Sequence, residues 1–199
     1  MAYIIGEWEF YGLTLHVNPS VLIPRDDTCA VTAMAIKQAL FLNAAPRILD
    51  LCTGSGCVGL AIANRVKDAR VVLGDISPAA IRVARKNIQN HSMGGRVTCM
   101  AIDATKPAMR FIGQFDLIVS NPPYSIKWAG DDNPLLINDP RFSPAGVLAP
   151  KSKADLAFIM HSLSWLATGG TAAIVCFPGI MYRGGAEQKI RKYLIDNNF

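Results

Sequence analysis

The 199-residue chain is poor in charged residues and histidine, and both shortages limit the class of protein it can be. Charged residues make up 18% of the sequence and hydrophobic residues 51%, a balance that excludes a disordered chain. The three histidines have no ligand or triad spacing, and the five cysteines are an odd number without a close CxxC pair. We therefore expect no metal site. No hydrophobic run approaches the roughly 20 residues of a membrane helix.

The cysteines stand in apolar surroundings, which is typical of reduced core residues and predicts a cytoplasmic protein. The start of the chain has no pattern of a secretory signal. The net charge of +5 permits an acidic partner such as nucleic acid, but it is too small to indicate one. A basic helix face with Arg82, Arg85 and Lys86 is typical of solvated surface.

Strand and helix signals alternate along the first 124 residues. A hairpin is expected over 8–17. Helices are expected over 26–43, 57–67 and 78–91, and strands over 47–51, 70–74, 96–102 and 115–120. This order predicts an α/β fold in a single domain over 1–199, a Rossmann-like parallel sheet with strand order 3-2-1-4-5.

The amino-acid composition of the sequence changes after residue 124. A long loop over 125–151 is rich in proline, glycine and aspartate, and loops of this length are often functional. A capping box at 152–155 predicts a helix through about residue 166. A fifth strand over 170–177 and a terminal helix over 186–197 complete the predicted elements.

Four polar side chains fall at the ends of predicted parallel strands: Asp50, Asp75, Asp103 and Asn121. Ligands of doubly wound sheets bind outside the carboxyl ends of the strands. The sequence therefore predicts one binding site that is assembled from four separated segments.

A glycine-rich turn follows Asp50. The run 54–59 (GSGCVG) fits GxGxxG, and Asp75 lies about twenty residues further on. This pattern suits a nicotinamide dinucleotide as well as S-adenosylmethionine. Asp50 favours S-adenosylmethionine, because a carboxylate before the glycines would attract its ammonium group and repel a pyrophosphate. An NAD-binding oxidoreductase remains the remote alternative.

The predicted cofactor contacts have simpler alternatives. Asp75 would accept hydrogen bonds from the ribose hydroxyls, or it is only a capping or turn residue. Asp103 would accept from the adenine amine, or it is only a turn residue. The full set of predicted cofactor-binding residues is Asp50, Thr53, Gly54, Gly56, Asp75, Ile76, Asp103, Ala104 and Asn121.

The run Asn121-Pro122-Pro123-Tyr124, here called the acceptor platform, follows the apolar strand over 115–120. The side-chain oxygen of Asn121 and the carbonyl of Pro122 would accept protons from one NH2 group, and Tyr124 would stack on its plane. Asn-Pro is also a common turn dipeptide. The platform suits methyl transfer to an amide or aromatic-amine nitrogen, with Asn121, Pro122 and Tyr124 as the predicted catalytic residues.

Residues 1–124 resemble the catalytic domain of the release-factor glutamine methyltransferases. The matching runs are 6–12 (GEWEFYG), 21–25 (VLIPR), 50–56 (DLCTGSG) and 120–124 (SNPPY). Residues 26–29 (DDTC) depart from the proline, acid, threonine and glutamate usual there. The resemblance implies a class I fold, S-adenosylmethionine as cofactor and a release factor as partner, although that family's helical N-terminal domain has no counterpart.

Residues 125–199 resemble the modification subunit of type I restriction systems, which methylates the exocyclic amine of adenine in DNA. The matching runs are 133–134 (NP), 139–142 (DPRF), 146–150 (GVLAP), 153–158 (KADLAF), 177–179 (FPG) and 183–187 (RGGAE). The two resemblances together imply a chimera with a splice near 121–125. That family's last two strands and its DNA-specificity subunit have no counterpart here.

The sequence thus predicts a methyltransferase that uses S-adenosylmethionine and acts on a planar nitrogen, either in DNA adenine or in a release-factor glutamine. The alternative is a folded chimera that binds the cofactor without turnover. Because two strands are expected to be missing, strand five would have an open edge and favour pairing with a second copy.

Overall fold

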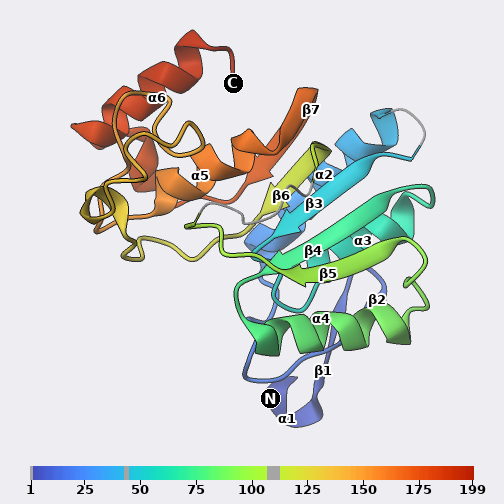
Figure 1. Cartoon of the computed structure of the whole chain (residues 1–199). Coiled ribbons are helices and arrows are strands. Elements are labelled where there is room, and N and C mark those ends of the chain that lie inside the picture. The colour runs from blue at the N-terminus through green and yellow to red at the C-terminus, as the bar shows by residue number, and fades with distance from the viewer. Residues whose placement is uncertain (1, 43–44, 107–112) are drawn as a thin grey trace. The chain divides into compact units, whose positions relative to one another are not determined.

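The computed structural model describes residues 2–42, 45–106 and 113–199 (Figure 1). These residues form two compact units, each described here by itself. The first unit contains 2–42, 45–103, 113–121 and Leu166–Val175, and the second contains 104–106, Pro122–Trp165 and Cys176–Phe199. One boundary lies between Asn121 and Pro122, inside the acceptor platform. The predicted single domain 1–199 and the splice near 121–125 stay predictions.

The first unit is built on a five-stranded parallel sheet. Its strands are β3 (Arg47–Leu51), β4 (Arg70–Asp75), β5 (Val97–Ala101), β6 (Phe115–Ser120) and β7 (Leu166–Ile174). They lie in the order β5-β4-β3-β6-β7, which confirms the predicted order 3-2-1-4-5. The central strand β3 pairs Ile48 with Val71 of β4 and with Leu117 of β6.

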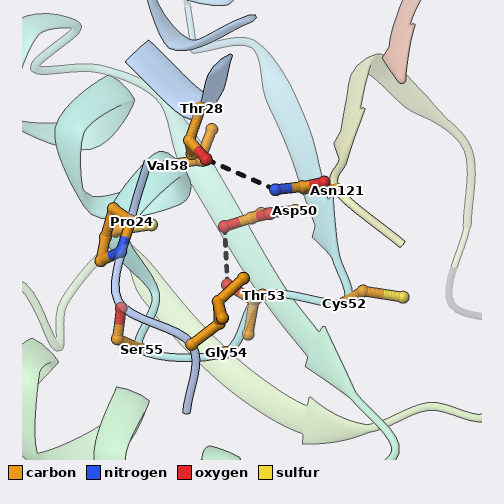
Figure 2. A pocket seen from close by; sticks show the side chains of 11 residues that line it. Pro24, Thr28, Asp50, Cys52, Thr53, Gly54, Ser55, Val58 and Asn121 are labelled. Atoms are coloured by element: carbon orange, nitrogen blue, oxygen red, sulfur yellow. Dashed lines mark hydrogen bonds between the residues drawn. The ribbon is translucent and has the colours of Figure 1, made fainter. Parts of the chain in front are cut away.

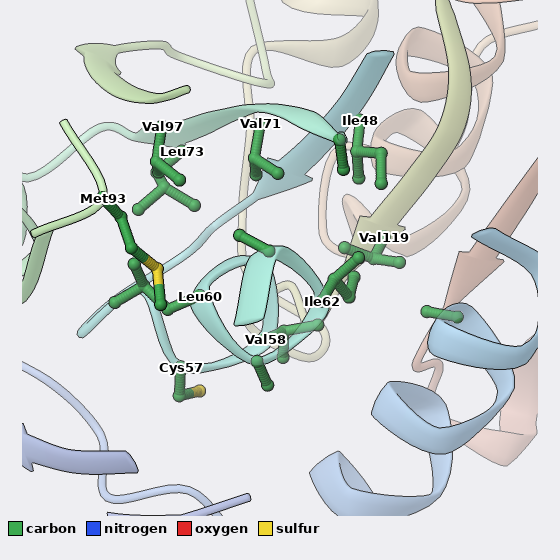
Figure 3. Close-up of a cluster of buried hydrophobic side chains, with 14 of the residues drawn as sticks. Ile48, Cys57, Val58, Leu60, Ile62, Val71, Leu73, Met93, Val97 and Val119 are labelled. Carbon is green, nitrogen blue, oxygen red and sulfur yellow. The ribbon is translucent and has the colours of Figure 1, made fainter. Parts of the chain in front are cut away.

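Three helices of the first unit share one apolar core with the sheet. They are α2 (Asp26–Phe41), α3 (Cys57–Arg65) and α4 (Pro78–Asn90). Figure 3 shows Leu60 and Ile62 of α3 facing strand residues such as Ile48 and Leu73. All four of these side chains are fully buried. Strands that are covered in this way carry near-continuous hydrophobic runs, which is why the sequence pattern identified them.

An N-terminal hairpin adds to this core. It follows the short helix α1 (Ala2–Ile5) and consists of β1 (Glu7–Phe10) and β2 (Leu13–His16). Tyr11 and Gly12 at its tip both have positive φ, of 50° and 74°, as the favoured two-residue hairpin turns require. Phe10, Leu13 and Leu15 are buried in the same core cluster as α3.

Two predicted elements begin elsewhere than expected. Strand β7 starts at Leu166 rather than at residue 170, with a register shift opposite Phe115 and Leu117. Gly169 and Gly170 lie inside this irregularity, so the glycines mark a bulge within the strand instead of its start. The predicted capping box at 152–155 is wrong, because α5 begins only at Asp155 and Ala154 caps it without a side-chain bond.

The second unit has little regular structure before its helices. It contains the 3-10 turns η1 (Gly130–Asp132) and η2 (Pro178–Met181) and the helices α5 (Asp155–Ser164) and α6 (Ala186–Asp196). The long loop 125–151 is ordered by bonds at its two ends: Trp128 N–H donates to the Lys151 carbonyl at 3.0 Å, and Trp128 Nε1 donates to the Pro150 carbonyl at 3.1 Å.

Candidate functional site

The glycine turn, residues 53–59, connects the carboxyl end of β3 to helix α3. Thr53 N–H donates to the Gly74 carbonyl of β4 at 3.0 Å, and Gly56 N–H donates back to the Thr53 carbonyl at 2.9 Å. Gly56 stands at φ 83° directly before the helix, a conformation that side chains other than glycine adopt only with strain. Gly54 in the same turn also has a positive φ, of 56°, so both glycines suit the reversal of the chain before α3.

Gly59 lets helix α3 lie close against the sheet. A Cβ atom at this position would stand 2.3 Å from Leu73 Cδ2 and 3.1 Å from Asp50 Oδ2. A Cβ at Gly54 would meet nothing within 4 Å, so the turn leaves open space on the other side. The last glycine of the GxGxxG pattern thus serves packing, while Gly54 leaves room for a ligand.

Asp50 supports the glycine turn from within the core. Its side chain is only 2% exposed, and Oδ2 accepts a hydrogen bond from Thr53 Oγ1 at 2.6 Å (Figure 2). The same oxygen also accepts from Gly59 N–H at 2.9 Å. Burial raises the pKa of Asp50 to about 7, although both hydrogen bonds oppose the shift. A carboxyl group with this pKa changes charge near neutral pH.

Asp75 joins two loops at the ends of neighbouring strands. Its Oδ2 accepts from Gly54 N–H at 2.9 Å, and its Oδ1 accepts from Ser77 N–H at 2.9 Å. Ser77 in turn caps α4, because its Oγ accepts from Ala80 N–H at 3.3 Å. A carboxylate has about four lone-pair positions, so Asp75 retains capacity for a ligand hydroxyl.

A pocket opens above the turn, and it brings residues from three separated segments together (Figure 2). Asn121 at the end of β6 lines it, and Asn121 Nδ2 donates to Thr28 Oγ1 of α2 at 3.4 Å. Asp50 lines it as well. The walls comprise Leu22, Pro24, Thr28, Asp50, Cys52, Thr53, Gly54, Ser55, Cys57, Val58 and Asn121.

The pocket contains four of the predicted site residues: Asp50, Thr53, Gly54 and Asn121. Gly56, Asp75, Ile76 and Asp103 belong to the same unit but lie outside these walls. Ala104, Pro122 and Tyr124 belong to the second unit. The turn and Asn121 are therefore gathered in one place, and the remaining predicted contacts stay predictions.

The sequence reading missed Cys52, which lines the pocket at φ 60°. Burial, together with the negative charges of Asp75, Asp50 and Asp103, raises the pKa of its thiol to about 12. The three predicted acids thus act on one thiol at the same edge of the sheet. The only signal in the sequence was the position of Cys52 directly before the turn.

Asn87 of α4 is a second residue that the sequence reading missed. Its fully buried amide donates from Nδ2 to the Ser55 carbonyl at 2.9 Å and to the His16 carbonyl at 3.0 Å. His16 N–H donates to Asn87 Oδ1 at 2.7 Å. Asn87 therefore ties the glycine turn to the end of the N-terminal hairpin.

Among residues 2–42, 45–106 and 113–199, no group of three or more His, Cys, Asp or Glu side chains is placed to hold a metal ion. In the part of the chain that the structure describes, no helix has both the length and the apolar character needed to cross a membrane.

A family model of the N-6 DNA methylases matches residues 30–199. This match covers the glycine turn, the acceptor platform, the second unit and the first unit from residue 30 on. The chain belongs to the N-6 DNA methylase family.

Curated relatives of this chain carry two kinds of name. It is 66% identical over 85 residues to the methylase subunit of a type I restriction enzyme from Mycoplasma pneumoniae, which covers 43% of this chain and 16% of the relative. It is 39% identical over 186 residues to a release factor glutamine methyltransferase from Bordetella pertussis, covering 94% of this chain and 62% of the relative. Both resemblances seen in the sequence are thus confirmed.

A solved structure supports the same assignment. The methyltransferase subunit of a type I restriction-modification system from Streptococcus thermophilus matches with a TM-score of 0.77 and 29% identity, covering 89% of this chain and 39% of that one. A class I S-adenosylmethionine-dependent methyltransferase from Listeria monocytogenes has the same fold at 15% identity, with a TM-score of 0.69. The predicted class I fold is confirmed. The chain spans less than two thirds of the length of each curated relative named above.

Proposed function

We propose that this chain is an N-methyltransferase that uses S-adenosylmethionine and acts on a planar nitrogen. One observation carries the proposal: Asn121, the first residue of the acceptor platform, lines the same pocket as the glycine turn. A residue suited to hold an acceptor NH2 group and a turn suited to a cofactor therefore lie side by side. The family and fold comparisons support the same cofactor.

The residues around the pocket fit S-adenosylmethionine. When bound, this cofactor supplies an electrophilic methyl group on a positively charged sulfur. Gly54 leaves space for it, since a Cβ there would meet no atom within 4 Å. The carboxylates of Asp75 and Asp103 suit its hydroxyl and amine groups, and the charged form of Asp50 suits a cationic ligand. A pyrophosphate would face the same carboxylates, which disfavours the NAD-binding alternative.

Asn121, Pro122 and Tyr124 would then hold the acceptor. The side-chain oxygen of Asn121 and the Pro122 carbonyl accept the two protons of the NH2 group, which draws the nitrogen out of conjugation and increases its lone-pair density. Tyr124 is 45% exposed, and its ring would stack on the plane of the acceptor. The nitrogen would form a bond to the methyl carbon while the sulfur–methyl bond of the cofactor breaks, so that a neutral thioether is left and one proton of the NH2 group passes to solvent. Positioning and electrostatics carry the rate, without a covalent intermediate.

Adenine in DNA is the acceptor that we favour. The matching family is named for N-6 DNA methylation, and the 66% identity is to a type I restriction methylase subunit. The solved structure with the TM-score of 0.77 is also such a subunit. The exocyclic amine of adenine is a planar NH2 group and suits the acceptor platform.

The glutamine amide of a release factor is the second candidate. It is favoured by the 39% identity to the Bordetella pertussis methyltransferase over 94% of this chain. A primary amide presents the same planar NH2 group to Asn121. The chain would act here on a protein instead of a nucleic acid.

Two measurements test the proposal. Calorimetric titration with S-adenosylmethionine should show binding, and Asp75→Ala should weaken it, because Asp75 also holds Gly54 N–H. Transfer of a radiolabelled methyl group should then be followed to duplex DNA and to a glutamine-containing release-factor peptide. Label on DNA supports the first acceptor and label on the peptide the second. Cofactor binding with label on neither supports the binding-only chimera, and no heat of binding contradicts the proposal.

Self-association and location are kept as proposals. Among the described residues, β7 pairs with β6 on one side only, and the open side of such a strand favours pairing with a second copy. Size-exclusion chromatography at high protein concentration tests this, and a monomer there would contradict it. The cytoplasmic location predicted from the sequence has a direct test in cell fractionation.

A further inference from the structure

The acceptor platform ends in a strained turn that is held from helix α5. Ser125, directly after Tyr124, has φ 50°, a left-handed conformation that costs a residue other than glycine roughly 1–2 kcal/mol. Such a turn persists only where its surroundings hold it. Residues 125 and 126 therefore need partners elsewhere in the second unit.

Two hydrogen bonds to residues at the start of α5 fix residues 125 and 126. Asp155 Oδ1 accepts from Ser125 N–H at 3.1 Å. Ala154 N–H donates to the Ile126 carbonyl at 2.9 Å. The two bonds run in opposite directions between adjacent residues, so together they fix the position and the direction of the chain. Only the first of them depends on a side chain.

Asp155 makes this bond from a buried position, where a carboxylate is energetically unfavourable. It is 5% exposed, and its Oδ2 has no hydrogen-bond partner among the described residues. Burying a polar atom without a partner is unfavourable. The start of α5 offsets part of this, because the positive end of the helix dipole favours an acid in the first turn. A buried acid with an unpartnered oxygen suggests that Asp155 has a role other than stabilising the fold.

Ser125 follows the predicted catalytic residues directly in the chain, and two of the four platform residues before it are prolines. Pro122 and Pro123 have φ locked by their rings, so residues 122–124 form a short and stiff segment. Its first end is set by Asn121 at the end of β6, and its second end is set by Ser125. A platform that is fixed at both ends can hold the Pro122 carbonyl and the Tyr124 ring in register with an acceptor.

We propose that Asp155 is a positioning residue for methyl transfer, which holds the acceptor platform through Ser125 N–H. This inference rests on the proposed function, and it gives a role to the run 153–158 (KADLAF), which that function left unexplained. Asp155 bonds to the residue that follows the acceptor platform and is not a wall residue of the pocket, so we expect it to affect the acceptor rather than the cofactor.

The test compares three variants of the full chain. Asp155→Ala removes the acceptor of the Ser125 bond, and Asp155→Asn keeps an oxygen in the same place. Glu187→Ala is the matched control, because Glu187 is a 4% exposed acid of the same unit whose ion-pair partner is Arg183, remote in sequence from the platform. Each variant is measured for S-adenosylmethionine affinity, for kcat and KM of methyl transfer, and for hydrogen exchange at the Ser125 amide.

For Asp155→Ala we expect a kcat lowered by ~10- to 100-fold, as for a displaced reacting group. We also expect unchanged cofactor affinity and faster exchange at Ser125. Asp155→Asn should restore most of the rate and the protection, and Glu187→Ala should change neither. Parent-like transfer by Asp155→Ala, or an equal loss in the Glu187→Ala control, overturns the inference.

The same experiment separates this inference from the proposed function. A parent protein that transfers no label contradicts the function. The Ser125 amide then decides the inference by itself: protection lost in Asp155→Ala and kept in Asp155→Asn supports the hold, and equal protection in all variants overturns it.

Discussion

The glycine turn and the long loop 125–151 hold their shapes by different means. The turn stands on a parallel sheet, and its N–H groups are bonded by the carboxylates of Asp50 and Asp75. The long loop has no sheet beneath it within its unit. It is held by hydrogen bonds between its two ends, such as Trp128 Nε1 to the Pro150 carbonyl, and by packed rings: Phe142 lies 5.6 Å from Trp128 and 4.6 Å from His161, measured between the centroids of tilted rings. The two regions rely on different residues, so single changes should affect them separately.

The largest effect is expected from Phe142→Ala. Phe142 is 1% exposed and stacks on two rings, so its removal should lower the free energy of unfolding by about 3–5 kcal/mol. Urea denaturation followed by tryptophan fluorescence measures this loss. Calorimetric affinity for S-adenosylmethionine should stay within about twofold of the parent, as expected if the regions are separate. Phe142→Leu is the milder control, and a parallel loss of cofactor affinity in both variants would refute the separation.

Gly59→Ala should produce the reverse pattern. The new Cβ would overlap Leu73 Cδ2 at 2.3 Å and press on Asp50 Oδ2, which predicts a loss of about 1–3 kcal/mol from overpacking. Cofactor affinity should fall by at least tenfold, because the helix and the turn must shift together. Gly146→Ala in the long loop is the matched control: its φ is 73°, and no atom lies within 4 Å of the new Cβ. That variant should lose only the strain energy of roughly 1–2 kcal/mol and keep its cofactor affinity.

The two regions also differ in how far the sequence predicted them. Hydrophobic runs and the GxGxxG pattern are local signals, so the strand order and the glycine turn followed from them. The bulge at Gly169 and Gly170 did not, because glycines look alike in a loop and in a bulged strand. The bond between Asp155 and Ser125 spans 30 residues. Contacts of this kind depend on how the elements pack, which local patterns do not encode.

The two regions should respond to pH with opposite signs. Asp50 has a pKa raised from 3.8 to about 7 by burial, so the folded state binds its proton more tightly than the unfolded state does. Its contribution to stability is therefore present at low pH and is lost as the pH rises from about 4 to 7. Asp50→Asn should gain on the parent across that window by up to ~1.4 kcal/mol per pH unit, measured by urea denaturation at each pH.

Asp139 of the long loop provides the opposite case. The bidentate bond from Arg141, at 2.8 and 2.6 Å, lowers the pKa of Asp139 below its usual value. Its contribution is present above about pH 4 and is lost as the pH falls through the lowered pKa. Asp139→Asn should therefore differ from the parent at neutral pH and approach it in acid. The same pH dependence in both asparagine variants would contradict the contrast.

The smallest effects should come from two residues with left-handed backbone, one directly before the glycine turn and one at the start of the long loop. Cys52 in the pocket has φ 60° and Ser125 after the platform has φ 50°, so glycine at either position relieves strain and also increases the freedom of the unfolded chain. Each change should therefore alter the free energy of unfolding by no more than about 1 kcal/mol, measured by denaturation. The functional readouts should differ: Cys52→Gly removes a wall of the pocket and should change cofactor affinity alone, whereas Ser125→Gly loosens the platform and should lower kcat alone. Each substitution leaves the hydrogen bonds of the other region intact. If both variants changed the same parameter, cofactor affinity or kcat, the glycine turn and the acceptor platform would therefore form one coupled site.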